Sequence, residues 1–147
     1  MKIAVGSDHA GYEEPAPYFK PAIMDHLKAL GHEVIDCGTE GPAAVDYPDC
    51  ADNVCAAIMR GEAERGVLIC GTGVGISIAA NRHFGIRAAV CATPYMAELS
   101  RSHNDANVLC LGRRALTLEE CIVITDTWLA ADFSGGERHM RRIKKLG

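Results

Sequence analysis

The sequence has few aromatic residues, which make up only 5% of its 147 positions. Proteins that stack nucleic-acid bases need aromatic platforms, and proteins that bind duplexes need a basic surface. This chain offers neither, because its formal net charge is −4 at pH 7. It also lacks any apolar run close to the roughly 20 residues that a membrane-spanning helix requires. We therefore expect neither a nucleic-acid partner nor a membrane partner.

Two cysteine patterns are also missing. The seven cysteines include no C-x-x-C pair, so zinc sites and thioredoxin-like sites have no support. Their number is odd, most of them lie in apolar runs, and the first residues form a strand pattern rather than a signal peptide. We expect a reducing, cytoplasmic location without a disulfide framework, in which most cysteines are small core residues.

The remaining composition is that of a globular chain, with 48% hydrophobic and 23% charged residues. We expect one domain, residues 1–147. Short apolar runs alternate with helical patterns, which predicts a doubly wound α/β fold, a three-layer α/β/α sandwich around five parallel strands. Such sheets bind ligands at the carboxyl ends of their strands. The expected strands are 3–6, 33–37, 67–70, 86–90 and 107–111. The expected helices are 19–30, 49–60, 75–82, 94–102, 117–131 and 137–146.

The segment 66–82 is the most informative. A buried strand ends at Cys70, and glycine then occupies every second position, Gly71, Gly73 and Gly75, before a helix begins. The free N–H groups and the positive end of a helix dipole can hold an anion at such a turn. The turn could also be glycine-rich only to avoid steric clashes. The G-x-G-x-G spacing and the missing Lys-Ser or Lys-Thr argue against dinucleotide and P-loop sites.

Cys70 has two interpretations. It could be one more buried core cysteine, as most cysteines are. A helix N-terminus, however, lowers the pKa of a thiol, and a thiolate can abstract a proton next to a carbonyl while neighbouring N–H groups hold the resulting oxyanion. The position at the end of a strand favours the second interpretation.

Other polar groups lie at the ends of predicted strands, and we expect them to gather at the same edge of the sheet. Each has a plainer alternative as a cap, a turn or a solvated surface. They are Asp8-His9, Asp46-Tyr47, His103-Asn104-Asp105 and Arg113-Arg114. In the basic tail, Arg138 and Arg142 are four residues apart and share a helix face. Two adjacent guanidinium groups make a good bidentate clamp for a phosphate.

As a set, these segments resemble the type B ribose-5-phosphate isomerases, a family that also contains galactose-6-phosphate isomerase subunits. The resemblance extends over nearly the whole chain in the correct order. It implies a Rossmann-like fold and an aldose–ketose isomerase that interconverts D-ribose 5-phosphate and D-ribulose 5-phosphate without metal or cofactor. The matching segments are 6–11, 31–36, 46–49, 70–81, 85–88, 103–109, 111–113 and 138–142.

The resemblance also implies roles for individual residues. Cys70 would move a proton between C2 and C1 through an enediolate, which Thr72 and the backbone of the glycine turn would stabilise. Asp8 and the partner's His103 would help to open the sugar ring. The turn residues that would contact the substrate are Gly71, Gly73, Val74 and Gly75. The phosphate would be bound by His9, Arg138, Arg142 and the partner's Arg113. The sugar would be contacted by Tyr47 and Asn104.

A site shared in this way requires a homodimer or a tetramer, with the last helix extending to a partner subunit. One branch of the family places a glutamate base in the glycine turn, where this chain has Ile76, so Cys70 is the only candidate base in this region. The segment Tyr12–Tyr18 is longer than the family pattern, and Glu137 stands before Arg138 where glycine is usual.

Several functional alternatives remain open at this level. Allose 6-phosphate, galactose 6-phosphate or a tetrulose phosphate could be the substrate. The chain could also be a sugar-phosphate-binding module without catalysis, or Cys70 could act as a redox sensor.

Overall fold

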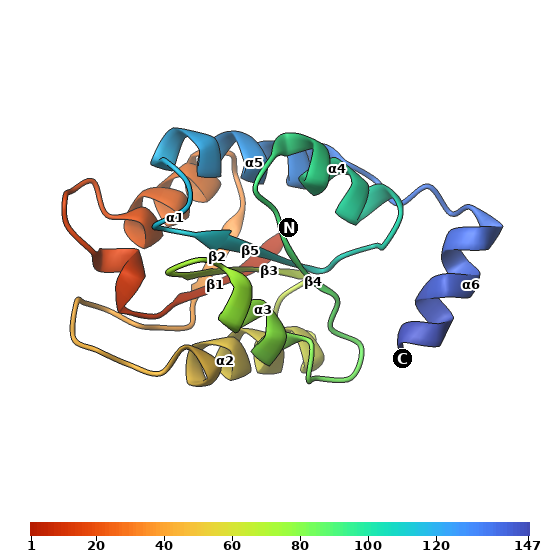
Figure 1. Cartoon of the computed structure of the whole chain (residues 1–147), viewed down its shortest axis with the longest axis horizontal. Coiled ribbons are helices and arrows are strands. Elements are labelled where there is room, and N and C mark those ends of the chain that lie inside the picture. The colour runs from red at the N-terminus through yellow and green to blue at the C-terminus, as the bar shows by residue number, and fades with distance from the viewer.

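The computed structural model describes all residues from 1 to 147 and is built around one parallel sheet (Figure 1). The sheet order is β2-β1-β3-β5-β4, and every neighbouring pair is parallel. This confirms the predicted doubly wound sheet of five strands. The strands are β1 (Lys2–Ser7), β2 (Glu33–Asp36), β3 (Arg65–Cys70), β4 (Ala88–Val90) and β5 (Val108–Gly112).

Helices cover both faces of the sheet, as the predicted three-layer sandwich requires (Figure 1). One face carries α1 (Phe19–Ala29), α4 (Pro94–Ser102) and α5 (Leu118–Ala130), and the other carries α2 (Tyr47–Met59) and α3 (Val74–Ala80). The helix α6 (Glu137–Leu146) stands apart from this sandwich, beyond α4 (Figure 1). A short 3-10 helix, η1 (His9–Tyr12), follows β1 directly. None of the helices combines the length and the apolar character that crossing a membrane demands.

The strand β3 shows why the predicted sheet is buried on both faces. Its side chains alternate between the two faces, as in any strand. Val67 and Ile69 belong to the core shared with α1 and α5, whereas Leu68 and Cys70 belong to the core shared with α2 and α3. Burial of each Val, Leu or Ile side chain contributes about 1.5–3 kcal/mol, so the continuous apolar run fixes β3 at the centre. Cys70 therefore ends β3 on the α2 and α3 side.

Some boundaries differ from those expected. The helix α2 begins at Tyr47 rather than at Asp49, because Pro48 fits the first turn of a helix, where no backbone N–H is needed. Tyr47 is therefore a helical residue, not a loop residue. The strand β5 reaches Gly112, and β4 is shorter than predicted. All seven cysteines are free.

Candidate active site

The Cys70 turn lies where three strands end together. In the sheet register, Cys70 of β3 pairs with Gly112 of β5, and Ile69 pairs with Ser7 of β1. Cys70 is 4% exposed, and its Sγ accepts a hydrogen bond from the Gly73 N–H at 3.1 Å. The sulfur thus lies at the end of the core shared with α2 and α3, in contact with Gly73, the residue directly before α3.

Gly73 is needed for this geometry. Its φ is +81°, a conformation that side chains disfavour, and a Cβ there would meet the carbonyl carbon of Leu111 at 3.1 Å. The steric explanation of the glycine turn is therefore correct at this position. It does not exclude the anion-binding explanation, because the same turn directs the Gly73 N–H at the Cys70 sulfur.

The turn leaves several donors free. The Val74 N–H donates to Thr72 Oγ1 at 3.3 Å, and the Gly73 N–H donates to Cys70. The N–H groups of Gly71, Thr72 and Gly75 donate to no protein atom. Unpaired donors of this kind at a helix start can stabilise a negative charge that develops on an oxygen.

Tyr47 and Asp8 border this turn. A Cβ on Gly75 would come within 2.8 Å of the Tyr47 ring and 3.1 Å of its hydroxyl, so the absence of a side chain lets the phenol lie against the turn. Asp8 is 6% exposed and caps η1, with one carboxylate oxygen accepting the Ala10 N–H at 2.9 Å. Asp8 is therefore a cap, as its plainer interpretation proposed, and it is fixed at the carboxyl end of β1.

His9 lines a cavity of about 350 Å³. Its Nδ1 accepts the Val45 N–H at 3.4 Å, which leaves Nε2 as the free ring nitrogen. The cavity is bordered by the segment 13–18, which follows η1. The residues that line it are His9, Tyr12, Glu13, Glu14, Tyr18 and Pro42.

Arg113 lies at the same edge as Cys70. Its backbone N–H donates to the Cys70 carbonyl at 2.9 Å. Its guanidinium lies 4.3 Å from the centre of the Phe19 ring, and Nη2 donates to the carbonyls of Glu13 and Glu14 at 3.3 and 3.2 Å. In this chain Arg113 holds the segment 13–18 in place. This contact could not be predicted, because Arg113 and Glu13 are 100 positions apart.

The second group of predicted residues lies elsewhere. His103 follows α4 and precedes β5, so it sits near the amino end of that strand, whereas Cys70 lies at the carboxyl edge of the sheet. Its ring is stacked on His139 of α6, with centroids 4.2 Å apart. Arg138 and Arg142 are on the same helix α6. Our expectation that all the polar groups gather at one edge is therefore wrong for His103 and Asn104, because a residue that precedes a parallel strand is at its opposite end.

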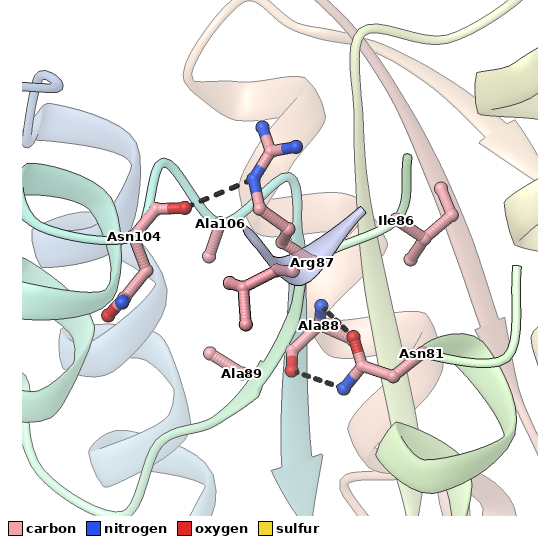
Figure 2. A pocket seen from close by; sticks show the side chains of 8 residues that line it. Asn81, Ile86, Arg87, Ala88, Ala89, Asn104 and Ala106 are labelled. Carbon is pink, nitrogen blue, oxygen red and sulfur yellow. Dashed lines mark hydrogen bonds between the residues drawn. The ribbon is translucent and has the colours of Figure 1, made fainter. Parts of the chain in front are cut away.

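Asn104 borders a cavity of about 410 Å³ between α6 and the strand β4 (Figure 2). Its carbonyl oxygen accepts a hydrogen bond from Arg87 Nε at 3.0 Å. Nearby, the Asn81 side chain pairs with both backbone groups of Ala88, at 2.7 and 2.9 Å (Figure 2). These bonds occupy the free edge of β4, which would otherwise expose unpaired backbone groups. Cys70 is not among the residues that line this cavity.

The predicted site is thus split into two groups within one chain. The Cys70 group contains Asp8, His9, Tyr47, Cys70, the turn 71–75 and Arg113. The α6 group contains His103, Asn104, Arg138 and Arg142, together with His139, for which we predicted no role. The structure brings together no three His, Cys, Asp or Glu side chains that could hold a metal ion.

Known proteins resemble this chain over almost its full length. The sequence profile of the ribose/galactose isomerase family matches residues 3–146. Ribose-5-phosphate isomerase B of Escherichia coli is 50% identical over 145 residues, which is 99% of this chain and 93% of that protein.

Solved structures also resemble this chain over almost its full length. The ribose-5-phosphate isomerase B of Clostridium thermocellum superposes with a TM-score of 0.94 and 55% identity, covering 100% of this chain and 95% of that one. The type B ribose 5-phosphate isomerase of Trypanosoma brucei superposes with a TM-score of 0.91 and 41% identity, covering 99% and 95%. From this agreement of sequence and fold, we conclude that the chain belongs to the ribose/galactose isomerase family.

Proposed function

We propose that this protein interconverts D-ribose 5-phosphate and D-ribulose 5-phosphate, as an aldose–ketose isomerase that uses Cys70 as its base. The observation that carries the proposal is the position of the Cys70 sulfur beside three unpaired N–H groups at the carboxyl edge of the sheet. The relatives named ribose-5-phosphate isomerase B support the choice of substrate, since their identity to this chain is 50% and 55%.

The chemistry follows from the charge that the reaction creates. In the open-chain sugar, a thiolate of Cys70 removes the proton at C2 and returns it to C1, while the hydroxyl proton on O2 passes to O1, so that the C1 carbonyl becomes a hydroxyl and C2 becomes the carbonyl. The intermediate enediolate carries negative charge on oxygen, and the N–H groups of Gly71, Thr72 and Gly75 are free to bind it. Thr72 already holds the Val74 N–H through its hydroxyl, so its side chain also fixes the start of α3.

Ring opening needs an acid and a base near the anomeric oxygen. Asp8 supplies a carboxylate at the edge of the Cys70 group, and Tyr47 contributes a hydroxyl that lies against Gly75. His103 belongs to the α6 group and would reach the Cys70 group of a second subunit. The separation of the two groups within one chain supports this arrangement, because the residues for one complete site are split between opposite edges of the sheet.

The phosphate would be held by cations from both groups. Arg138 and Arg142 stand one helical turn apart on α6, whose side chains are largely exposed. His9 offers a free Nε2 beside the cavity of the Cys70 group. Arg113 Nη2 would bind the phosphate by exchanging its bonds to the Glu13 and Glu14 carbonyls for bonds to the ligand.

The active unit in this proposal is a homodimer, which could pair further into a tetramer. Large apolar side chains on α3, on α4 and before β4 are exposed, and a second subunit could cover them. They are Val74 (51%), Ile78 (61%), Phe84 (83%) and Tyr95 (68%). The free thiols suit a reducing compartment, so we place the enzyme in the cytoplasm.

A panel of sugar phosphates tests the function directly. The purified protein should convert ribose 5-phosphate faster than allose 6-phosphate, galactose 6-phosphate or a tetrulose phosphate. A faster reaction with another member would keep the chemistry and change the substrate. If no member is converted but all bind, the protein is a sugar-phosphate-binding module and the isomerase proposal is wrong.

A further inference from the structure

The loop between α4 and β5 carries two residues of the α6 group, His103 and Asn104. Asp105 turns the backbone of this loop with a φ of +46°, and it is the only residue other than glycine with a positive φ in the chain. Glycine adopts this left-handed conformation readily, whereas most residues with a Cβ avoid it. The contacts of the Asp105 carboxylate show what a glycine at this position would lack.

Two arginines share the carboxylate of Asp105. Arg101 Nη1 donates to Oδ1 at 2.8 Å, and Arg87 Nη2 donates to Oδ2 at 3.2 Å. The side chain of Arg101 is 7% exposed and that of Arg87 is 21% exposed, so both cations are largely removed from water. Hydrogen bonds between ionised groups are stronger than those between neutral groups. One carboxylate therefore joins the end of α4 to the segment before β4.

The same two arginines hold the backbone of the loop. Arg87 Nε donates to the carbonyls of Asn104 and Asp105, both at 3.0 Å, and Figure 2 shows the first of these bonds. Arg101 Nη1 donates to the Ala106 carbonyl at 2.7 Å. Three successive carbonyl groups are thus bound by two cations, and the carboxylate keeps these cations beside each other.

Both ends of this network are attached to the rest of the fold. The Arg87 N–H donates to Asn107 Oδ1 at 2.8 Å, and the Arg87 carbonyl accepts the Asn107 N–H at 3.0 Å, at the start of β5. At the beginning of the loop, the His103 ring is stacked on His139 of α6. The loop therefore connects the sheet to the helix that carries the phosphate-binding arginines of the proposed site.

We propose that Asp105 is a positioning residue: by holding Arg87 and Arg101 together, it sets the orientation in which His103 and Asn104 meet the Cys70 group of a second subunit. This proposal rests on the proposed isomerase function. Asp105 itself does not touch the substrate. Its effect on the reaction comes through the loop, because side chains that act on a substrate need support that fixes them to within a fraction of an ångström.

Ring opening is the step that depends on His103. Opening the furanose ring of ribose 5-phosphate moves the proton of the C1 hydroxyl to a base, breaks the bond between C1 and the ring oxygen, and gives that oxygen a proton. Ribulose 5-phosphate has no such ring, because its C5 oxygen carries the phosphate and cannot close on C2. A displaced His103 should therefore slow the reaction of the aldose more than hydrogen exchange in the ketose, which needs only the base Cys70.

Two variants of Asp105 test the proposal in the purified enzyme. Asp105→Asn keeps the shape of the side chain but loses its charge, whereas Asp105→Gly removes the side chain and relieves the backbone. The kcat for ribose 5-phosphate should fall on the order of tenfold in Asp105→Asn and about a hundredfold in Asp105→Gly, with a smaller change in KM. Exchange of the C1 hydrogens of ribulose 5-phosphate with deuterated solvent should fall less than kcat. An undiminished kcat in Asp105→Gly, or equal losses of kcat and exchange, would overturn the proposal.

Asp126→Asn is the matched control. Asp126 is about half exposed and pairs with His26 at 2.6 Å, which joins α5 to α1, so its kcat and exchange rate should equal those of the wild type. Thermal unfolding should show that Asp105→Gly is folded at the assay temperature, because the relieved backbone offsets part of the lost ion pairs. If it is unfolded there, Asp105→Asn and Arg87→Gln decide the question by the same comparison of kcat with exchange.

The pKa of His139 gives a readout that needs no substrate. Burial lowers this pKa, and repulsion from His103 lowers it further. Loss of the Asp105 charge alone would lower a histidine pKa, whereas displacement of His103 would raise it. An NMR titration should therefore show a higher pKa of His139 in Asp105→Gly and no change in Asp126→Asn; an unchanged or lower value in Asp105→Gly would overturn the proposal. If the wild type converts no sugar phosphate but this pKa still rises, the proposed function is wrong and the positioning of His103 by Asp105 stands.

Discussion

His103 and His139 are stacked, with ring centroids 4.2 Å apart and 13° between the ring planes. Burial lowers the pKa of His139, and the neighbouring His103, Arg138 and Arg142 lower it further by charge repulsion. We predict that His103→Gln raises the pKa of His139, although it stays below the ordinary value of 6.5 because burial and the arginines remain. An NMR titration of the ring signals measures this change, and the other histidines serve as the reference.

The sign of the associated stability change also follows. A histidine whose pKa is lower in the folded chain resists protonation there, so its contribution to stability is complete above the unfolded value near 6.5. That contribution is lost as the pH falls from there toward the folded value. Thermal unfolding should therefore show a steeper loss of Tm below pH 6.5 in the wild type than in His139→Gln. Parallel curves would show that the stack does not couple to folding.

The Cys70 turn could be predicted because its signals are local. The apolar run, the terminal cysteine and the alternating glycines are contiguous, and the helical spacing of Arg138 and Arg142 follows from their positions alone. The contact between Glu13 and Arg114 could not be predicted, because 101 positions separate the two residues and neither belongs to a periodic pattern. Our assignment of His103 to the same edge as Cys70 was wrong for a topological reason. In a parallel sheet, the residues that precede a strand and those that follow it lie at opposite edges.

Cys70→Ala should abolish isomerisation without disturbing the fold. Cys70 is buried at the end of β3 and faces the core of α2 and α3, so alanine removes little volume and no partner except the Gly73 N–H. Exchange of the C2 hydrogen with deuterated solvent, followed by NMR, should fall to background while sugar-phosphate binding by calorimetry persists. Residual exchange at the wild-type rate would exclude Cys70 as the base. Cys110→Ala, a fully buried thiol in the same core, is the matched control and should retain exchange.

A mixture of two inactive variants tests the shared site. Cys70→Ala damages the Cys70 group, and His103→Gln damages the α6 group. If each site combines one group from each subunit, a mixed dimer carries one intact site and one site with both changes. Unfolding and refolding an equal mixture should restore about a quarter of the wild-type activity, because half of the dimers are mixed. Each variant refolded alone should stay inactive, and a mixture without activity would place both groups in one subunit.

The buried amine of Lys20 provides a stability prediction remote from Cys70. Lys20 is completely buried, and its Nζ is paired with Asp36 and donates to the Thr39 carbonyl at 2.7 Å. Asp36→Asn removes the countercharge of the buried ammonium, so the free energy of unfolding should fall by about 1–3 kcal/mol. The control is Glu33→Gln, which removes an exposed pair with Lys2 at 3.7 Å and should cost under about 1 kcal/mol.

Acid should reduce the difference between wild type and Asp36→Asn. Burial raises the pKa of Asp36, but the hydrogen bonds from Lys20 and the Gly38 N–H outweigh it and leave this pKa below the ordinary 3.8. A carboxylate with a lowered pKa gives its full stability above the unfolded value and loses it as the pH falls toward the folded value. Urea unfolding should therefore show the full difference at pH 7 and a smaller one below pH 4. An equal difference at both pH values would mean that packing of the side chain, rather than its charge, stabilises the end of β2.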